Sequence, residues 1–322
     1  MEPQAGGACR AGNIYNLLQR VLYRMVEQGQ LEYAQIPVIS LNLMGEEKHT
    51  GFRITPSLLS GGIAAGCYGD LIMCLYQQVK PYEQNPGETD RIRSQVEKKL
   101  CESIRRHRNG RHTREKNYRY ACEAFSKVPV KPGKKKRVGI TGEIYMKYSK
   151  LGNDDIESFL LRQGMEPYSG GFVNYCLYLV DTERYKAEKY QHNPIMAKAC
   201  AFVLHRLCEA QKHLLTVIGE TDRFQTDLPF PELKEKVQGI LAEGCNTGDG
   251  WLIAAEVIQY VEKGCGSVLI LHPFGCLVSH VCERGILQRL HARFPDVSIQ
   301  TIEYDYDQSK TLRESRILLA IS

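Results

Sequence analysis

The segment over residues 268–319 limits the fold more than any other part of this 322-residue chain. Its apolar side chains first form a short buried run and then recur at helical spacing, and the same succession follows once more. The predicted strand, helix, strand and helix cover residues 268–272, 286–294, 297–304 and 312–319. Strands that are joined by helices pair in parallel, so the sequence predicts an α/β fold with a parallel sheet.

A second alternation of strand and helix begins at residues 137–142, a short apolar run that predicts a buried strand. The nine residues before it, 128–136, contain two prolines and cannot continue a helix. A chain of this length is expected to form two domains with separate cores. We therefore expect a first α/β domain over residues 1–127, with a strand at 36–41 and a basic helical extension, a linker over 128–136 and a second α/β domain over 137–322.

Further helices are indicated by apolar residues at helical spacing that proline or glycine terminates. They are expected over residues 12–28, 57–79, 91–125, 153–163, 194–219, 231–242 and 249–263, with a break in the third near Asn109 and Gly110. The third holds many of the lysines and arginines that give the chain its formal charge of +5. Acidic residues are interspersed there, which favours a solvated helix surface over a site for an acidic partner, and no nucleic-acid partner is expected.

The N-terminal residues show neither the basic start nor the apolar segment of a secretory signal. No uninterrupted apolar run approaches the roughly 18 residues that a membrane-spanning helix needs. We therefore expect a cytoplasmic protein without a membrane partner.

Twelve cysteines are many for a reducing compartment, where disulfides are rare, and they favour metal ligation or redox work. Three of them, Cys9, Cys245 and Cys276, lie in loops directly before predicted helices. A helix N-terminus stabilises the thiolate that a metal requires. Cysteines within helices, such as Cys67 and Cys200, fit packing stripes better.

The loops around Cys245 and Cys276 carry the chemistry-bearing patterns. Residues 272–280 (HPFGCLVSH) follow a predicted strand, at the edge of the sheet where open α/β sheets bind ligands. Residues 244–250 (GCNTGDG) allow three interpretations: Cys245 is a ligand, the loop amides bind a phosphate of a nucleotide or of CoA, or the glycines only form a turn.

Zinc is an alternative metal, because histidines and cysteines cluster in the sequence at His272, Cys276, His280 and Cys282. The chain nevertheless contains no C-x-x-C pair, the close pairing that structural zinc sites usually show. The absence of such pairs disfavours zinc.

Several stretches resemble the 2-hydroxyacyl-CoA dehydratase activase-related proteins, in their C-terminal part. The most specific are residues 244–256 (GCNTGDGWLIAAE), 272–280 (HPFGCLVSH) and 297–318 (VSIQTIEYDYDQSKTLRESRIL). Shorter similar stretches lie at residues 7–15, 37–42, 68–71, 79–82 and 138–153. Because long members of this family have much sequence before the Cys9 motif, we expect the chain to be a fragment or the product of a split gene.

The resemblance implies two flavodoxin- or Rossmann-like domains with parallel sheets and added helices, which hold an iron–sulfur cluster of the 4Fe-4S type in a cleft between them. We expect Cys9 and Cys276 to be ligands and Cys245 to be a third. Three residues are expected to donate hydrogen bonds to the cluster: Arg10, Asn246 and His280.

The resemblance also implies a component of a lyase or oxidoreductase system that accepts low-potential electrons from an ATP-dependent activase for reductive or radical dehydration. An acyl-CoA substrate and a homodimeric assembly are compatible with it. Two other classes stay open: a structural or regulatory zinc protein, and a cluster-free scaffold that docks an activase.

Overall fold

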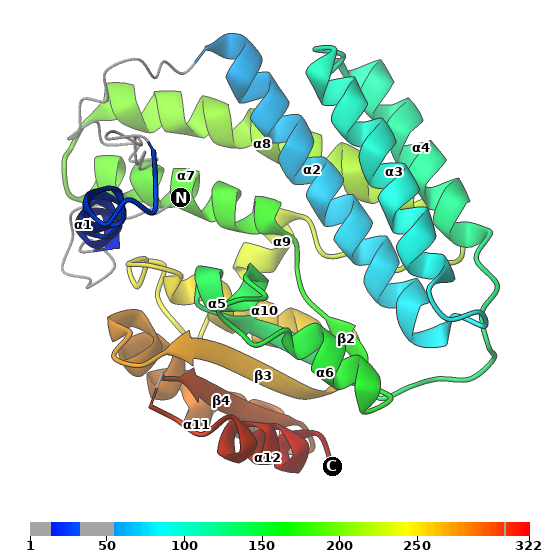
Figure 1. The fold of residues 1–322 in the computed structure, drawn as a ribbon. Coiled ribbons are helices and arrows are strands. Elements are labelled where there is room, and N and C mark those ends of the chain that lie inside the picture. Colours follow the sequence, from blue (N-terminus) through cyan, green and yellow to red (C-terminus); the bar gives the residue numbers. More distant parts are fainter. Residues whose placement is uncertain (1–13, 33–54, 306) are drawn as a thin grey trace. The chain divides into compact units, whose positions relative to one another are not determined.

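A computed structural model of the chain describes residues 14–32, 55–305 and 307–322 (Figure 1). The chain divides into two units, one of residues Met1–Ile54 with Gly275–Leu277, the other of Thr55–Phe274 with Val278–Ser322. In the first unit, helix α1 (Ile14–Glu27) matches the helix that the sequence predicts there. The strand that the sequence predicts at residues 36–41 lies outside the described residues.

The second unit contains a four-stranded sheet. Its strands are β1 (Arg137–Gly142), β2 (Glu166–Tyr168), β3 (Cys265–Pro273) and β4 (Ser298–Tyr304). They lie in the order β2-β1-β3-β4, and every neighbouring pair is parallel. The predicted α/β class with a parallel sheet is confirmed.

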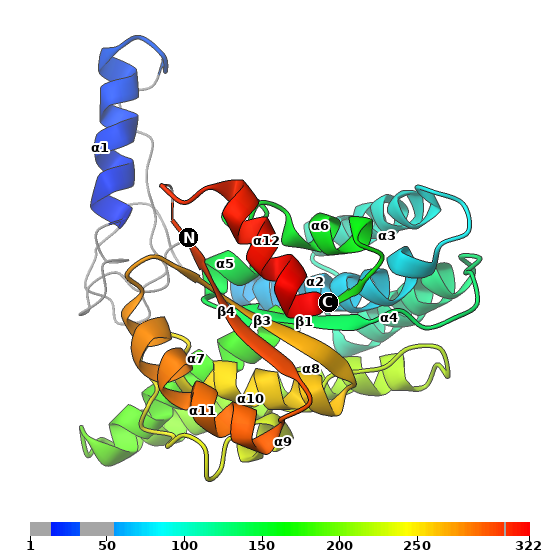
Figure 2. The same cartoon turned by 90° about the horizontal axis from the view of Figure 1, so that it is seen from below.

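Helices cover both faces of the sheet, which explains why β1 and β3 are nearly uninterrupted apolar runs. Three helices pack on one face: α5 (Ile144–Tyr148), α6 (Ile156–Arg162) and α12 (Lys310–Ile321). The other face meets α10 (Gly250–Glu262) and α11 (Arg284–Arg293). Figure 2 shows α6 and α12 on one side of the strands and α10 and α11 on the other.

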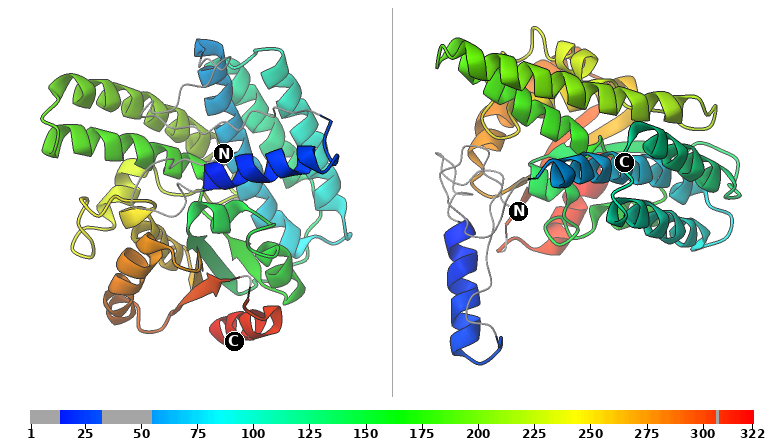
Figure 3. Two further views of the ribbon diagram at one scale, coloured as in Figure 1. Left: turned by 60° about the vertical axis from the view of Figure 1, so that its left-hand side comes forward. Right: turned by 90° about the horizontal axis from the view of Figure 1, so that it is seen from above.

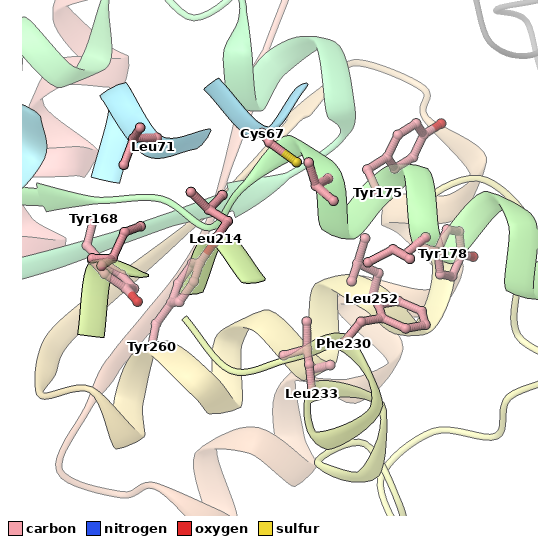
Figure 4. Packing of buried hydrophobic residues seen from close by; sticks show 14 of the residues in the cluster. Cys67, Leu71, Tyr168, Tyr175, Tyr178, Leu214, Phe230, Leu233, Leu252 and Tyr260 are labelled. Carbon is pink, nitrogen blue, oxygen red and sulfur yellow. The ribbon is translucent and has the colours of Figure 1, made fainter. Parts of the chain in front are cut away.

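A layer of further helices packs beyond α10. It consists of α2 (Pro56–Val79), α3 (Glu88–Arg105), α4 (Arg111–Ser126), α7 (Phe172–Lys189), α8 (Pro194–Gly219) and α9 (Phe230–Glu235), with short helical turns at Lys80–Tyr82 and Ser279–Glu283. In Figure 3, α7 and α8 form an antiparallel pair. Figure 4 shows side chains of α2, α7, α8 and α10 meeting in one core, among them Cys67, Tyr178, Leu214 and Leu252.

The structure divides the chain at a different place from the predicted linker at residues 128–136. Val128 is buried in the same core as the helices on both sides of it. The backbone N–H of Lys131 donates to the carbonyl of Tyr82 at 2.7 Å, and Arg223 donates to the carbonyl of Val128 at 3.0 Å. The prolines therefore mark an ordered connection within the second unit, and residues 55–127 contribute helices α2, α3 and α4 to the core of that unit.

Helix α2 is apolar, and 28% of its membrane-length window is buried within the structure. By length and composition alone, the stretch Ser57–Tyr82 could cross a membrane, which differs from the expectation drawn from uninterrupted apolar runs. Residues spaced at three and four positions on this helix, such as Ala64, Cys67, Leu71 and Leu75, are fully buried against the neighbouring helices. Packing within the protein accounts for the apolar character of this face.

Three elements, β2, α5 and α7, were not predicted from the sequence. β2 is only three residues long and contains Pro167, which is tolerated because β2 is an edge strand. Helix α7 has no side-chain cap of its own, and the carboxylate of Asp70 on α2 instead accepts from the N–H groups of Phe172 at 2.7 Å and Val173 at 2.9 Å. A cap that comes from about 100 residues away leaves no local sequence signal.

Candidate functional site

The carboxyl ends of β1 and β3 form the point where the sheet changes its winding direction. From β1 the chain continues through α5 and α6 on one face, and from β3 it continues into α11 on the other (Figure 2). The loops after these adjacent strands therefore leave toward opposite faces. Open α/β sheets bind their ligands at such a point, so the residues there form the candidate site.

The two strands approach each other closely at this end. Gly142 has a φ of +130°, and a Cβ atom built on it would lie 2.0 Å from the carbonyl oxygen of Leu271. The next N–H, that of Glu143, donates to the same carbonyl at 2.8 Å. A side chain at residue 142 would push β1 and β3 apart, so the glycine places Glu143 beside the end of β3.

A buried ion pair lies directly behind this point. The ammonium of Lys147 on α5 donates to both carboxylate oxygens of Glu256 on α10, at 2.7 and 2.8 Å. The side chains are only 4% and 3% exposed, and the hydroxyl of Thr141 on β1 donates to Glu256 at 2.5 Å. The hydrogen bonds of the pair thus involve residues of β1, α5 and α10, and they link these three elements to one another.

Three further carboxyl groups gather at the same end of the sheet: Glu143, Asp249 and Glu283. Burial raises the pKa of Asp249 well above its ordinary value, and the nearby charges of Glu143 and Glu283 raise it further. Burial likewise raises the pKa of Glu283 to about 8, although a hydrogen bond from Ser279 to its Oε1 at 2.7 Å opposes the shift. The second oxygen of Glu283 has no hydrogen-bond partner among the described residues.

The raised pKa of Glu283 predicts that stability falls with increasing pH. Between pH 4.5 and about 8, the folded protein retains a proton on Glu283 that the unfolded chain releases, so a rise in pH favours unfolding. The variant Glu283→Gln cannot titrate there, and we expect it to gain roughly 1–3 kcal/mol over the wild type between pH 5 and pH 8. Urea unfolding at both pH values measures this change. The exposed control Glu235→Gln should keep the wild-type slope, and an equally steep slope for Glu283→Gln would contradict the assignment.

Cys276 lies in the loop directly after β3, as predicted, and precedes a helical turn. Its side chain is buried, with 7% of its surface exposed. Gly275 before it has a φ of +70°, and the N–H of Phe274 donates to the carbonyl of Tyr304 at 2.9 Å. The loop therefore leaves β3 in a tight turn that β4 supports.

Two histidines flank Cys276 in the sequence and meet one carboxylate of β4. Oε2 of Glu303 lies 4.0 Å from Nδ1 of His272, 3.8 Å from Nε2 of His280 and 3.2 Å from a guanidinium nitrogen of Arg284. His272 is fully buried, burial lowers its pKa, and its Nε2 has no partner among the described residues. Because burial lowers the pKa of His272, the imidazole is neutral near pH 7, and each of its nitrogens can accept or donate only one hydrogen bond.

Cys245 lies in the turn before α10 and is partly exposed. The glycines of this turn meet parts of the protein itself: a Cβ on Gly250 would lie 2.2 Å from the carbonyl oxygen of Cys245, and one on Gly248 would lie 2.5 Å from the side chain of Val278. The turn itself therefore accounts for both glycines of this loop. Asn246 is nevertheless buried, and its amide nitrogen is a hydrogen-bond donor for which the described residues supply no acceptor.

Not all of the expected ligands can be placed. Cys9 and Arg10 lie outside the described residues. Within the part of the chain that the structure describes, no three His, Cys, Asp or Glu side chains are arranged to hold a metal ion, and this includes the cluster around His272 and Cys282 that favoured zinc.

The sequence analysis did not identify Lys147 and Glu256, the residues of the buried ion pair, as candidate site residues. The signal was present for Glu256, which is one of the few polar residues in the apolar helix α10. Charged residues are almost never fully buried unless they are paired, so a buried Glu256 implies a cationic partner. Lys147 could not be selected as that cation, because the register of α5 against α10 is a tertiary feature.

Comparisons with known proteins give no relative: no family model, no curated protein and no solved structure matches this chain.

Proposed function

We propose that this chain is the iron–sulfur-cluster-binding component of a 2-hydroxyacyl-CoA dehydratase-like system. The observation that carries the proposal is the position of Cys276. This residue belongs to the most specific stretch of the family resemblance, and its loop begins at the carboxyl end of β3, beside the change in winding direction. Soft thiolate ligands are typical of iron–sulfur clusters.

Cys9 is proposed as a ligand together with Cys276, as the family resemblance implies. Each of the two cysteines lies in the sequence shortly before a helix, where the thiolate that a metal requires is stabilised. Cys245 is proposed as a third ligand, from the loop that packs on Val278 through Gly248.

Hydrogen-bond donors near a cluster tune its potential, and two candidates are described. The unpartnered amide nitrogen of buried Asn246 is a donor of the required kind. His280 contributes an imidazole that is 38% exposed and faces Glu303. Arg10 completes the set that the resemblance implies.

The proposed role is that of an electron-accepting component. An ATP-dependent activase domain or subunit supplies low-potential electrons to it, and an acyl-CoA is the substrate class for reductive or radical dehydration. The protein acts in the cytoplasm, as a homodimer or as part of a larger assembly.

Metal analysis after anaerobic purification and reconstitution tests this function. We expect iron and acid-labile sulfide in comparable amounts, together with the broad visible absorbance of sulfide-to-iron charge transfer. Zinc without sulfide would instead identify a structural or regulatory zinc protein. Absence of metal and sulfide from a folded chain would leave the scaffold role and refute the cluster.

A further inference from the structure

A hollow of about 720 Å³ lies on the outer surface of α3 and α4, on helices that the candidate site does not use. Five of its lining residues come from α3 at helical spacing: Arg91, Ser94, Gln95, Lys98 and Lys99. The sixth, Tyr120, comes from α4. Its volume falls within the range of sites for small organic ligands, which is about 300–1,000 Å³.

The lining of this groove is positively charged and contains no carboxylate. Lys98 and Lys99 make no ion pair among the described residues, and both are exposed. Arg91 in the lining pairs with Glu88 at 3.8 Å, and the charge of Lys99 acts on Glu123 of α4. The ammonium groups of Lys98 and Lys99 therefore remain outside ion pairs of the described residues at the hollow.

The polar groups of the groove are arranged as donors. The ammonium of Lys99 lies 3.2 Å from the centre of the Tyr120 ring, which holds it over the hollow. The hydroxyl of Tyr120 accepts from the amide of Gln95 at 3.3 Å and so keeps its own proton to donate. With the hydroxyl of Ser94, the groove offers two ammonium groups, one guanidinium and two hydroxyls.

We propose that this groove binds a small phosphate-bearing anion of the polyphosphate or nucleotide class. Several negative oxygens on one compact molecule match several cationic donors that line one hollow, and lysine is a common partner of phosphate. A single acidic side chain would fill only a small part of the hollow. The site is independent of the iron–sulfur proposal, because none of its residues belongs to the loops around Cys245 or Cys276.

Equilibrium titration with inorganic tripolyphosphate and, separately, with ATP tests the groove in the full-length protein. We expect one site with a Kd of about 0.1–1 mM in low salt, weakening as salt is raised, since the contacts are exposed. The double variant Lys98→Gln/Lys99→Gln should weaken binding at least about tenfold, and Ser94→Glu should abolish it by placing a carboxylate in the groove. Comparable affinities for both probes would identify the phosphates as the recognised group. Tighter binding of ATP would indicate an additional contact between the protein and the base.

Lys127→Gln is the matched control, because Lys127 is exposed directly after the end of α4, pairs with Glu123 and does not line the hollow. Its affinity should stay within twofold of the wild type. Equal loss in the control and in the double variant, or no binding of either probe at 5 mM, would overturn the proposal. Binding of a single-stranded oligonucleotide more than about 100-fold tighter than tripolyphosphate would also overturn it, since the surface would then serve a nucleic acid.

Discussion

The variant Cys276→Ser is expected to lose most of the iron that the reconstituted wild type holds. A serine hydroxyl is a poor substitute for thiolate toward a soft metal centre, and Cys276 lies in the loop that the proposed cluster requires. Cys9→Ser should lose iron to the same extent, and Cys245→Ser should lose part of it. Iron per chain, labile sulfide and visible absorbance measure the effect after anaerobic reconstitution.

Cys200→Ser provides the control, because Cys200 lies within helix α8 and not in a loop before a helix. It should retain wild-type iron. The cluster assignment fails if the Cys200 variant loses as much iron as the Cys276 variant, or if Cys9→Ser and Cys276→Ser both keep full iron content. Circular dichroism on each variant separates loss of metal from loss of fold.

The sequence was most informative where local signals and tertiary structure agree. Helix α8 spans the predicted residues, Pro194–Gly219, because proline occupies its first turn and Asn193 caps it through the N–H of Met196 at 3.1 Å. The alternation after residue 268 likewise became β3, α11, β4 and α12, with β3 and β4 in parallel. Both features depend on neighbours in the sequence.

Prediction was incomplete where the determining partner is distant in the chain. The predicted helix at 231–242 ends early, at Glu235, and the chain then turns through Gly239 with a φ of +80°. The predicted domain boundary at 128–136 differs from the observed division because the packing of α2, α3 and α4 against α7 and α8 has no local signature. Propensity alone could not reveal which helices share a core.

The same distinction applies to the site. The position of the Cys276 loop at the end of a strand followed from the alternating pattern, and the structure places that loop after β3. Lys147 and Glu256 come together only through the packing of α5 and α10, helices from different parts of the chain. Their roles therefore depend on geometry that a single sequence does not display.

The buried pair of Lys147 and Glu256 predicts the largest effect on stability. Removal of one partner leaves the other charge buried and unpaired, and such changes cost about 3–5 kcal/mol. We expect Glu256→Ala to lower the free energy of unfolding by this amount, because Lys147 is only 4% exposed and cannot reach water without moving α5. Urea unfolding at constant pH measures the loss.

Glu262→Gln on the same helix is the matched control, since its partner Lys236 and Glu262 itself are partly exposed, at 32% and 37%. Exposed pairs contribute about 0–1 kcal/mol, so this variant should change little. Removal of both charges, as in Lys147→Met/Glu256→Leu, should recover much of the loss, because two apolar side chains leave no buried charge behind. Recovery will remain incomplete, since the Thr141 hydroxyl then loses its acceptor. If the double variant were no more stable than Glu256→Ala, the cost would come from packing, and the pair would not be the electrostatic link between β1, α5 and α10 that its geometry indicates.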